Sequence, residues 1–209
     1  MASNCTRAPA RAAPDIRPVD SDEKLFDVID GERPNVLILT GPPGAGKTTV
    51  AGLLAQRFER TVHVESDRFF EFIASGYIEP WKTESHEQNQ LVMRIIGDTA
   101  ASYAAAGYFT IVDGILIPGW FFEVLRDVLH ARDTAVSYAV LRPSLSICME
   151  RSSRRAPDRL SDPVIIKQLW SGFANLGQLE KHVIDNGEQD PDSTAQVLAE
   201  RLRLGLLAT

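Results

Sequence analysis

Cysteine is scarce in this sequence. Among 209 residues there are two, Cys5 and Cys148, and they lie too far apart along the chain to form a metal-binding or redox motif. The four histidines likewise show no metal-ligand spacing, which favours core or surface roles for them. So few thiols are typical of a reducing compartment, and we therefore expect a cytoplasmic protein.

Long apolar runs and excess positive charge are missing as well. No run reaches the ~18 residues of a membrane span, and the N-terminus has arginines without the apolar core of a secretory signal. The net charge of −6 gives the chain no bulk attraction for nucleic acid or for an anionic membrane. We therefore expect neither a membrane nor a nucleic-acid partner.

What is present is an ordinary globular composition, 44% hydrophobic and 24% charged, in a chain long enough for one core. Residues 1–20 are rich in Ala, Pro and Arg without periodicity and are expected to form a disordered tail. Residues 21–34 are expected to hold a short helix, capped by Ser21 and ended by Gly31, and a linker. Residues 35–209 remain as the main domain, and they contain no internal repeat.

The main domain opens on its most informative stretch. Residues 35–40 are an apolar run of strand-forming residues, and residues 50–58 carry apolar residues at helical spacing. Between them stands Gly-Pro-Pro-Gly-Ala-Gly-Lys-Thr-Thr, which has the G-x-x-x-x-G-K-[ST] pattern of a phosphate-binding loop. A flexible Gly/Pro turn is the alternative, but the flanking strand and helix favour a nucleotide site.

Each residue type in this loop has a physical reason. Pro42 and Pro43 have no N–H, so the donors for a triphosphate must come from the backbone of residues 44–49, at a helix N-terminus. Lys47 brings a positive charge to the outer phosphates, and the Thr48 hydroxyl can hold Mg²⁺. The expected nucleotide-binding residues are Gly41, Gly44, Ala45, Gly46, Lys47, Thr48 and Thr49.

Strands and helices alternate along the rest of the domain. Further strands are expected at residues 61–67, 108–114, 134–141 and 182–185. Helices are expected at residues 68–75, 84–106, 120–130, 144–155, 163–181 and 190–206. This alternation predicts an α/β fold with a parallel sheet between helices, and it places ligands at the carboxyl ends of the strands.

Three acidic residues stand at expected strand ends. Glu65 and Asp67 are two positions apart, so an extended backbone would point both to one side. We expect Asp67 to accept the proton of an attacking hydroxyl and Glu65 to support a metal ion, with helix capping as the alternative for Asp67. Asp113 is expected to hold Mg²⁺ through water or to bind a substrate hydroxyl, and which of Asp67 and Asp113 is the base stays open. Because Gly114 follows Asp113 where a hydrolytic ATPase usually has glutamate, the pattern favours transfer over hydrolysis.

A basic segment follows the fourth expected strand. Arg151, Arg154, Arg155 and Arg159 fall within nine positions. Beside a nucleotide these arginines are suited to neutralise the charge of a transferring phosphoryl group, and Arg151 could also stack on adenine. Such a basic segment is usually a solvated helix face. The nearby phosphate loop nevertheless favours a catalytic role for these arginines.

Aromatic residues gather after the acidic strand ends, at residues 69–81 and 120–122. A pocket for a ring-bearing or partly apolar hydroxyl compound would have this composition. Most of these rings are expected in the core, but Trp81 and Trp120 lie beside Pro80 and Gly119 in expected loops. These two tryptophans are therefore candidates for a substrate pocket.

The phosphate loop, Asp67, the run Val112-Asp113-Gly114 and the arginines together resemble the small-molecule P-loop kinases. Shikimate kinase, gluconate kinase and, most similar in layout, chloramphenicol phosphotransferase belong to this group. The resemblance implies a three-layer fold, whose five parallel strands have the order 2-3-1-4-5, and an arginine-bearing lid at about residues 151–162 that closes over ATP. The acceptor-binding signatures of shikimate kinase are absent, so its substrate is not implied.

The resemblance also implies roles for individual residues. The expected catalytic residues are Asp67, Lys47, Arg151, Arg155 and Arg159, with Arg151 also at the nucleotide. The expected metal ligands are Thr48, Glu65 and Asp113, and the expected substrate contacts are Asp67, Asp113, Trp81 and Trp120. ATP is favoured over GTP because the N-K-x-D and D-x-x-G motifs of GTPases are absent.

We therefore expect an ATP- and Mg²⁺-dependent kinase that phosphorylates a hydroxyl of a small molecule, such as an antibiotic or another secondary metabolite. It is expected to act as a monomer or homodimer. Two alternatives are a nucleotide-sugar kinase of the zeta-toxin type, which shares the phosphate loop and an acid after the second strand, and a regulator that binds ATP without transfer.

Overall fold

The computed structural model describes residues 35–154 and 160–209 of the chain. The expected tail and N-terminal helix at residues 1–34 lie outside the described residues, as do Arg155 and Arg159 of the expected lid. Within the described ranges, no helix is both long and apolar enough to cross a lipid bilayer.

The described chain contains one sheet of five strands in the order β2-β3-β1-β4-β5, and neighbouring strands are parallel. The strands are β1 (Asn35–Thr40), β2 (Thr61–Glu65), β3 (Phe109–Gly114), β4 (Ala135–Leu141) and β5 (Val183–Ile184). The strand order and the parallel direction confirm the prediction from sequence. The second strand is two residues shorter than expected, because a helix begins at Ser66.

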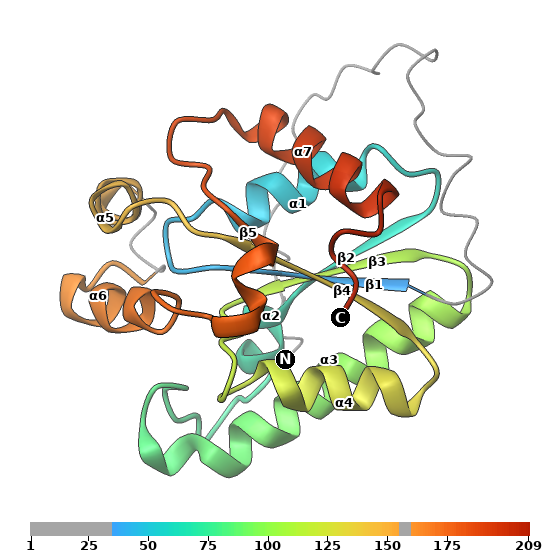
Figure 1. Ribbon diagram of the computed structural model, residues 1–209. Coiled ribbons are helices and arrows are strands. Elements are labelled where there is room, and N and C mark those ends of the chain that lie inside the picture. The colour runs from blue at the N-terminus through green and yellow to red at the C-terminus, as the bar shows by residue number, and fades with distance from the viewer. Residues whose placement is uncertain (1–34, 155–159) are drawn as a thin grey trace, which may run out of the picture.

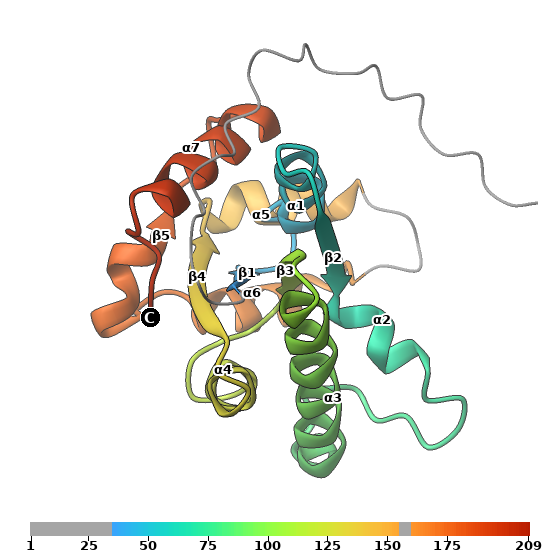
Figure 2. The same cartoon turned by 90° about the vertical axis from the view of Figure 1, so that its right-hand side faces the viewer.

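Helices cover both faces of the sheet, which gives the expected three layers (Figures 1 and 2). One face is covered by α1 (Lys47–Ala55) and α7 (Pro191–Arg203), and the other by α3 (His86–Ala105) and α4 (Phe122–Ala131). The remaining helices are α2 (Ser66–Glu71), α5 (Leu145–Ser153), α6 (Pro163–Ser171) and the short 3-10 helices η2 (Thr83–Ser85) and η3 (Gly177–His182). In Figure 1, α5 and α6 lie at the edge where the strands end.

The expected single helix at residues 163–181 is wrong, since α6 ends at Ser171 and η3 follows after a break. Gly172 passes so close to Ile117 that a Cβ at this position would meet the Ile117 side chain at 2.8 Å. The chain therefore packs tightly onto the segment after β3 at this point, and this contact is not visible in the local sequence.

Two apolar cores lie on the two faces of the sheet, because successive strand residues point to opposite sides. Leu37 and Leu39 of β1 pack with α1 and α7, whereas Val36 and Ile38 pack with α3 and α4. All four side chains are fully buried, and full burial of such a side chain stabilises the fold by about 2 kcal/mol. A strand buried on both faces explains the uninterrupted apolar run before the phosphate loop.

The strand register brings the carboxyl ends of three strands level with one another. Glu65 of β2 pairs with Asp113 of β3, and Asp113 in turn pairs with Leu39 of β1. One residue further on, Thr40 pairs with Gly114. The phosphate loop and the acidic strand ends therefore meet at one edge of the sheet, as the alternation of elements predicts.

Gly114 leaves the space in which Ser66, the first residue of α2, packs against the end of β3. A Cβ built on Gly114 would overlap the Ser66 hydroxyl. The position after Asp113 therefore has no room for a side chain while Ser66 keeps its place.

Replacing Gly114 by Ala should lower the free energy of unfolding by about 1–3 kcal/mol, the usual cost of overpacking a well-packed site. Urea denaturation measures this change. Ser66→Ala in the same chain removes the hydroxyl and should recover most of the loss. The matched control is Gly52→Ala in α1, where a Cβ meets nothing within 4 Å and alanine should be neutral or stabilising. Equal effects at positions 52 and 114 would contradict the packing argument.

His182, the last residue of η3, is fully buried, and neither ring nitrogen has a hydrogen-bond partner in the part of the chain that the structure describes. Its ring meets the buried Tyr138 ring edge-on at a centroid distance of 5.9 Å. Burial lowers the pKa of His182, and the positive charges of Lys181 and Arg201 lower it further. The imidazole is therefore neutral in the folded protein at pH 7.

This burial predicts a loss of stability in mild acid. The unfolded imidazole titrates near pH 6.5, so below that pH the unfolded state binds more protons than the folded state. The free energy of unfolding should fall as the pH drops, by at most about 1.4 kcal/mol per pH unit from this one group. His182→Phe should reduce that slope between pH 7 and pH 5, whereas His130→Phe, at an exposed position in α4, should not. Denaturation curves across this pH range measure the pH dependence of the free energy of unfolding. An unchanged slope in His182→Phe would contradict the prediction.

Candidate functional site

The phosphate loop joins β1 to α1 over residues 41–46. Gly44 and Gly46 have φ angles of 84° and 89°, in the left-handed region that favours glycine. Gly46 is the N-cap residue of α1, so the amides that follow it open the helix toward the loop. The Thr48 and Thr49 side chains are exposed on the first turn of α1. This backbone has the shape of an anion-binding helix N-terminus.

Lys47 folds its side chain back over the loop. Its buried ammonium group donates to the carbonyl oxygens of Gly41, at 2.9 Å, and Pro42, at 3.2 Å. A buried cation beside a ring of amides attracts an anion, because both carry positive charge toward the same small volume. The geometry therefore fits the phosphates of a nucleotide.

Two neighbouring segments hold the loop in place. Gly44 lies against the carbonyl group of Cys148 in α5, where a Cβ would collide with it. On the other side, the buried Asn186 donates from Nδ2 to the carbonyl oxygen of Ala45, at 2.9 Å. Sequence reasoning missed Asn186, whose only local signal is its place directly after the fifth strand. The loop is thus fixed by residues more than a hundred positions away.

A cavity of about 340 Å³ lies beside the phosphate loop and is lined by Gly44, Gly46, Arg151 and Asn186 among others. The Asn186 side-chain oxygen is buried and has no hydrogen-bond partner within the described ranges. A buried acceptor next to a phosphate loop fits a nucleoside that supplies a donor. The residues of this cavity therefore fit the rest of a nucleotide whose phosphates lie on the loop.

Arg151, predicted as a lid and nucleotide residue, lies in the last turn of α5. Its guanidinium group donates to the carbonyl oxygens of Asn186, at 3.4 Å, and Gly187, at 3.1 Å. These bonds hold Arg151 in the wall of the nucleotide cavity. Its part in charge neutralisation stays a prediction, as do the roles of Arg155 and Arg159.

The expectation that Glu65 and Asp67 point to the same side is wrong. β2 ends at Glu65 and α2 begins at Ser66, so the backbone between them is not extended. Glu65 lies 3.7 Å from Arg68 as an ion pair. Asp67 lies in the first turn of α2 and is exposed, whereas the N-cap position belongs to Glu65. Asp67 therefore does not cap this helix, and its carboxylate faces the cavity described below.

Asp113 is buried, and its Oδ2 lies 2.7 Å from Nε2 of His63 on the neighbouring strand. Both residues share the strand face of Ile111, which packs with α1. Asp113 is thus on the face of the sheet that carries the phosphate loop. Sequence reasoning missed His63, although its position two residues before Glu65 puts it on the face of Asp113.

The site residues fit Mg²⁺ only as a partner of bound phosphate. No group of three His, Cys, Asp or Glu side chains comes together in the described parts of the chain to hold a metal alone. Mg²⁺ in proteins commonly binds one or two carboxylates together with substrate phosphates. The Thr48 hydroxyl and the Asp113 carboxylate fit that mode, whereas Glu65 is engaged with Arg68.

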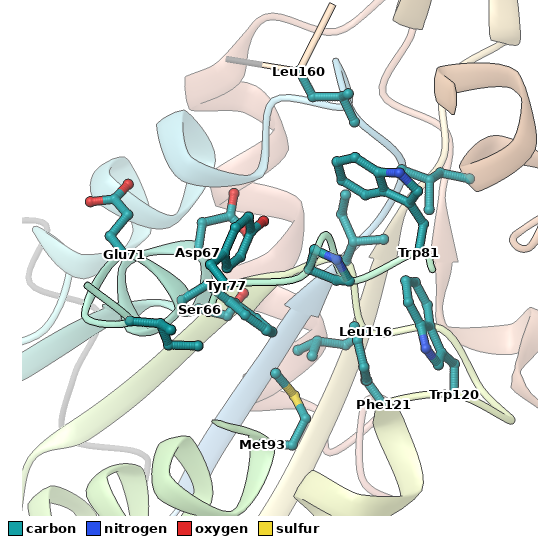
Figure 3. A pocket seen from close by; sticks show the side chains of 15 residues that line it. Ser66, Asp67, Glu71, Tyr77, Trp81, Met93, Leu116, Trp120, Phe121 and Leu160 are labelled. Carbon is teal, nitrogen blue, oxygen red and sulfur yellow. The ribbon is translucent and has the colours of Figure 1, made fainter. Parts of the chain in front are cut away.

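The larger cavity, of about 530 Å³, opens beside α2 at the same edge of the sheet (Figure 3). Its polar side consists of Ser66, Asp67 and Glu71. Its aromatic walls are Phe70, Tyr77, Trp81, Trp120 and Phe121, and Met93 and Leu116 lie at its base. The structure therefore brings the two candidate tryptophans and Asp67 into one cavity, although they are up to 53 positions apart in sequence.

Polar side chains at the start of α3 fix the loop that carries Tyr77 and Trp81. Gln88 donates to the carbonyl oxygen of Ile78, at 2.6 Å, and accepts from the Ile78 amide, at 2.9 Å. Asn89 donates to the carbonyl oxygen of Pro80, at 2.8 Å. Gln88 and Asn89 belong to no recognisable sequence motif, and sequence reasoning therefore missed them.

The base of the cavity is tied to the phosphate-loop strand. The amide of Leu116 donates to the Thr40 hydroxyl at 2.8 Å, and the buried Tyr138 hydroxyl donates to the Leu116 carbonyl oxygen at 3.2 Å. Thr40 is the residue before the phosphate loop. The segment after β3 that lines the cavity is therefore hydrogen-bonded to the residue that precedes the phosphate loop.

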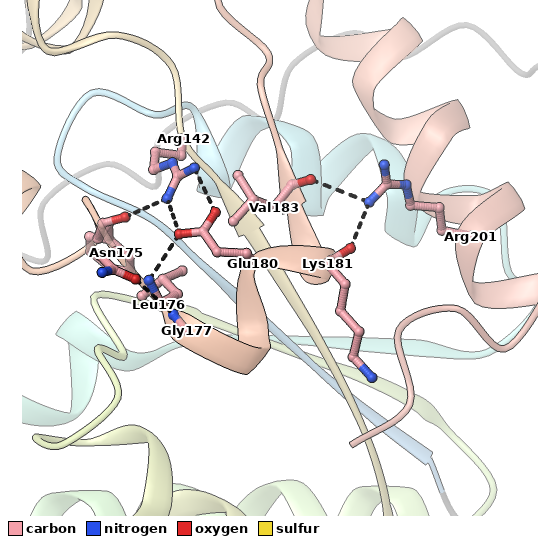
Figure 4. A network of polar contacts seen from close by, with 9 residues as sticks. Arg142, Asn175, Leu176, Gly177, Glu180, Lys181, Val183 and Arg201 are labelled. Carbon is pink, nitrogen blue, oxygen red and sulfur yellow. Dashed lines mark hydrogen bonds and ion pairs between the residues drawn. The ribbon is translucent and has the colours of Figure 1, made fainter.

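A polar network fixes the segment that follows α6 (Figure 4). Arg142 and Glu180 form two parallel bonds of 2.9 Å, and Arg142 also donates to the carbonyl oxygen of Phe173 at 2.7 Å. The Arg142 guanidinium group and the Leu176 amide together lower the pKa of Glu180 to about 2. Because α6 contributes Leu169 to the large cavity, this network also positions part of its wall.

Solved structures of similar fold include kinases and a resistance protein. A tunicamycin resistance protein from Deinococcus radiodurans superposes with a TM-score of 0.63 at 17% identity, covering 85% of this chain and 99% of that chain. The APS kinase of Mycobacterium tuberculosis, in complex with AMPPNP and APS, gives 0.59 at 15% identity, covering 81% and 98%. Shikimate kinase from Acinetobacter baumannii, in complex with shikimate, gives 0.56 at 21% identity, covering 83% and 94%.

At these identities the similarity shows the fold alone. No sequence among curated proteins matches the chain significantly. The sequence profile of the family described as "AAA domain" matches residues 36–179, which include the phosphate loop, the acidic strand ends and α6. The chain therefore belongs to this AAA-domain family, and its fold is that of the P-loop small-molecule kinases.

Proposed function

We propose that this protein is an ATP- and Mg²⁺-dependent phosphotransferase that phosphorylates a hydroxyl group of a small molecule. The observation that carries the proposal is a cavity of about 530 Å³, with Asp67 in its wall, at the sheet edge that also bears the phosphate loop. The smaller cavity beside the phosphate loop and the large cavity beside α2 would hold two different substrates. Hydrolysis would need only the first of them.

The proposed reaction uses this arrangement directly. The acceptor hydroxyl oxygen attacks the γ-phosphorus of ATP, the bond to the β,γ-bridging oxygen breaks, and ADP leaves with that electron pair. Asp67 takes the hydroxyl proton, while Lys47 and the amides of residues 44–49 hold the phosphate charge. Thr48 and Asp113 would hold Mg²⁺ beside the phosphates, where the ion would supply further charge neutralisation. His63 orients Asp113 for that contact.

The acceptor has to be found by screening. The named likeness to a tunicamycin resistance protein makes antibiotics and other hydroxylated metabolites the first compounds to test. The readout is acceptor-dependent ADP formation, followed by mass spectrometry for an added phosphate. Tight ATP binding without acceptor-stimulated ADP release across a broad library would overturn the proposal in favour of an ATP-binding regulator. Transfer to a UDP-sugar would favour the nucleotide-sugar kinase.

Asp67→Asn should lower kcat by about 10²–10⁴-fold, which is the usual contribution of a general base. The affinity for ATP should stay unchanged, because the phosphate loop does not contact this side chain. Steady-state kinetics and ATP titration measure the two effects. Glu71→Gln is the matched control, since Glu71 lies in the same cavity wall and loses the same charge but has no part in proton transfer. Unchanged turnover in Asp67→Asn would remove Asp67 from its role.

Gln88→Ala should raise the KM for the acceptor about tenfold, because loss of a hydrogen-bonded pair worth roughly 1.4 kcal/mol loosens the loop bearing Tyr77 and Trp81. The KM for ATP should not change, since Gln88 lies away from the phosphate loop. Gln90→Ala, two positions along α3, is the control and should alter neither constant. If both KM values rise together in Gln88→Ala, the hydrogen bonds of Gln88 have a general structural role and the prediction fails.

A further inference from the structure

The charged side chains that line the large cavity, among the described residues, are all acidic. Two ionisable carboxylates, Asp67 and Glu71, line it, and no Lys, Arg or His side chain is among its lining residues in the described parts of the chain. The remaining walls are aromatic or aliphatic apart from the Ser66 hydroxyl. The charge of Glu71 is shared with Arg68, whereas Asp67 has no ion pair within the described residues, so Asp67 carries the uncompensated negative charge of this lining.

The positive side chains nearest in sequence are each paired with an acid, and the partners of Arg68 include the lining residue Glu71. Arg68 pairs with Glu71 at 3.1 Å and with Glu65 at 3.7 Å. Lys82 pairs with Glu79 at 2.8 Å. Neither cation lines the cavity, and each already has a carboxylate partner, so neither is placed to neutralise an anionic acceptor group.

The pKa of Tyr77 is affected by the same acidic surroundings. Burial raises the pKa of the Tyr77 hydroxyl, and the negative charges of Glu79 and Asp67 raise it further. The cavity thus disfavours a phenolate, which is itself an anion. Carboxylate, sulfate and phosphate groups carry the same sign of charge and would meet the same opposition.

The aromatic walls act in the same direction. Trp81 and Trp120 stand on one side of the cavity and Tyr77 on another, as Figure 3 shows. The faces of such rings attract cations, tryptophan most strongly, and attract them more when water is excluded. A cation in this cavity would gain both from the rings and from the Asp67 carboxylate.

We propose that the acceptor is a ring-bearing alcohol without any anionic group, and that a protonated amine on it strengthens binding. The inference rests on the proposed function, because it specifies the substrate class of the same cavity. It disfavours carboxylate-bearing and phosphate-bearing acceptors, and with them the nucleotide-sugar alternative, whose substrate carries a diphosphate.

The test uses three alcohols that share one skeleton and differ in charge: 4-(aminomethyl)benzyl alcohol, 4-methylbenzyl alcohol and 4-(hydroxymethyl)benzoate. Binding to the full chain loaded with Mg²⁺ and AMPPNP is measured by calorimetry, so no turnover is needed. The amine should bind at least tenfold more tightly than the carboxylate, with the neutral compound between them, and added NaCl should narrow the difference. A carboxylate that binds as well as the amine would overturn the inference.

Charge variants assign the preference to the cavity. Glu71→Gln should reduce the difference between amine and carboxylate, and Glu71→Lys should reverse it. Glu150→Gln is the matched control, because Glu150 is also ion-paired with an arginine, Arg154 at 2.8 Å, but lies on α5 outside the cavity lining. If Glu150→Gln changes the preference as much as Glu71→Gln, the effect is not local and the inference fails.

A measurement without any acceptor covers the case in which all three alcohols bind too weakly. Trp170→Phe leaves Trp81 and Trp120 as the emitting tryptophans. Their fluorescence should be quenched more by Cs⁺ than by I⁻, relative to the neutral quencher acrylamide, and Glu71→Lys should invert that order. Stronger quenching by iodide would contradict the inference. Absence of phosphorylation with a preserved preference for cations would instead count against the phosphotransferase alone.

Discussion

The passage of the chain from β1 into α1 is the constraint on which the site depends. Between Thr40 and Lys47 the backbone leaves a strand that is buried on both faces, curls around a small volume and opens a helix. Left-handed backbone and unpaired amides persist only where surrounding structure holds them. Here Asn186 fixes the Ala45 carbonyl and α5 closes over Gly44, so contacts within the protein support the cradle. A cradle held by the protein itself spares the ligand the cost of ordering it.

The sheet then separates the two halves of the proposed chemistry. Alternation along β3 turns Asp113 toward the α1 face, beside His63 and the phosphate loop. Asp67 belongs to α2 instead, and its carboxylate faces the large cavity. In the proposed reaction, two carboxylates that look equivalent in the sequence therefore serve different reactants, Asp113 the nucleotide and Asp67 the acceptor. The hydrogen bond from Leu116 to Thr40 keeps these two regions in register.

The acceptor cavity is built from apolar walls held by polar contacts behind them. Gln88 and Asn89 fix the loop bearing Trp81, and the Arg142–Glu180 pair fixes the segment after α6. Water has few partners on such walls, which strengthens electrostatic interactions inside a closed site. The same property makes the sign of the lining charge decisive for what can bind. In the proposed function, substrate choice and catalysis both depend on one feature, a carboxylate in an apolar cavity.

The sequence by itself determined the phosphate loop, the alternation of strands and helices, and the parallel sheet, because these follow from local spacing and from a motif formed by chain neighbours. The strand order was implied by the resemblance to the small-molecule P-loop kinases, and the structure confirms it. The sequence also identified Asp67, Trp81 and Trp120 as candidate site residues, and all three line the large cavity. Only the tertiary structure decided the partners: His63 for Asp113, Asn186 for Ala45, and Ser66 for the space beside Gly114. The common orientation expected for Glu65 and Asp67 failed for the same reason. Whether a strand continues or turns into a helix after Glu65 depends on packing against β3, and packing between distant segments leaves no periodic signal in the chain.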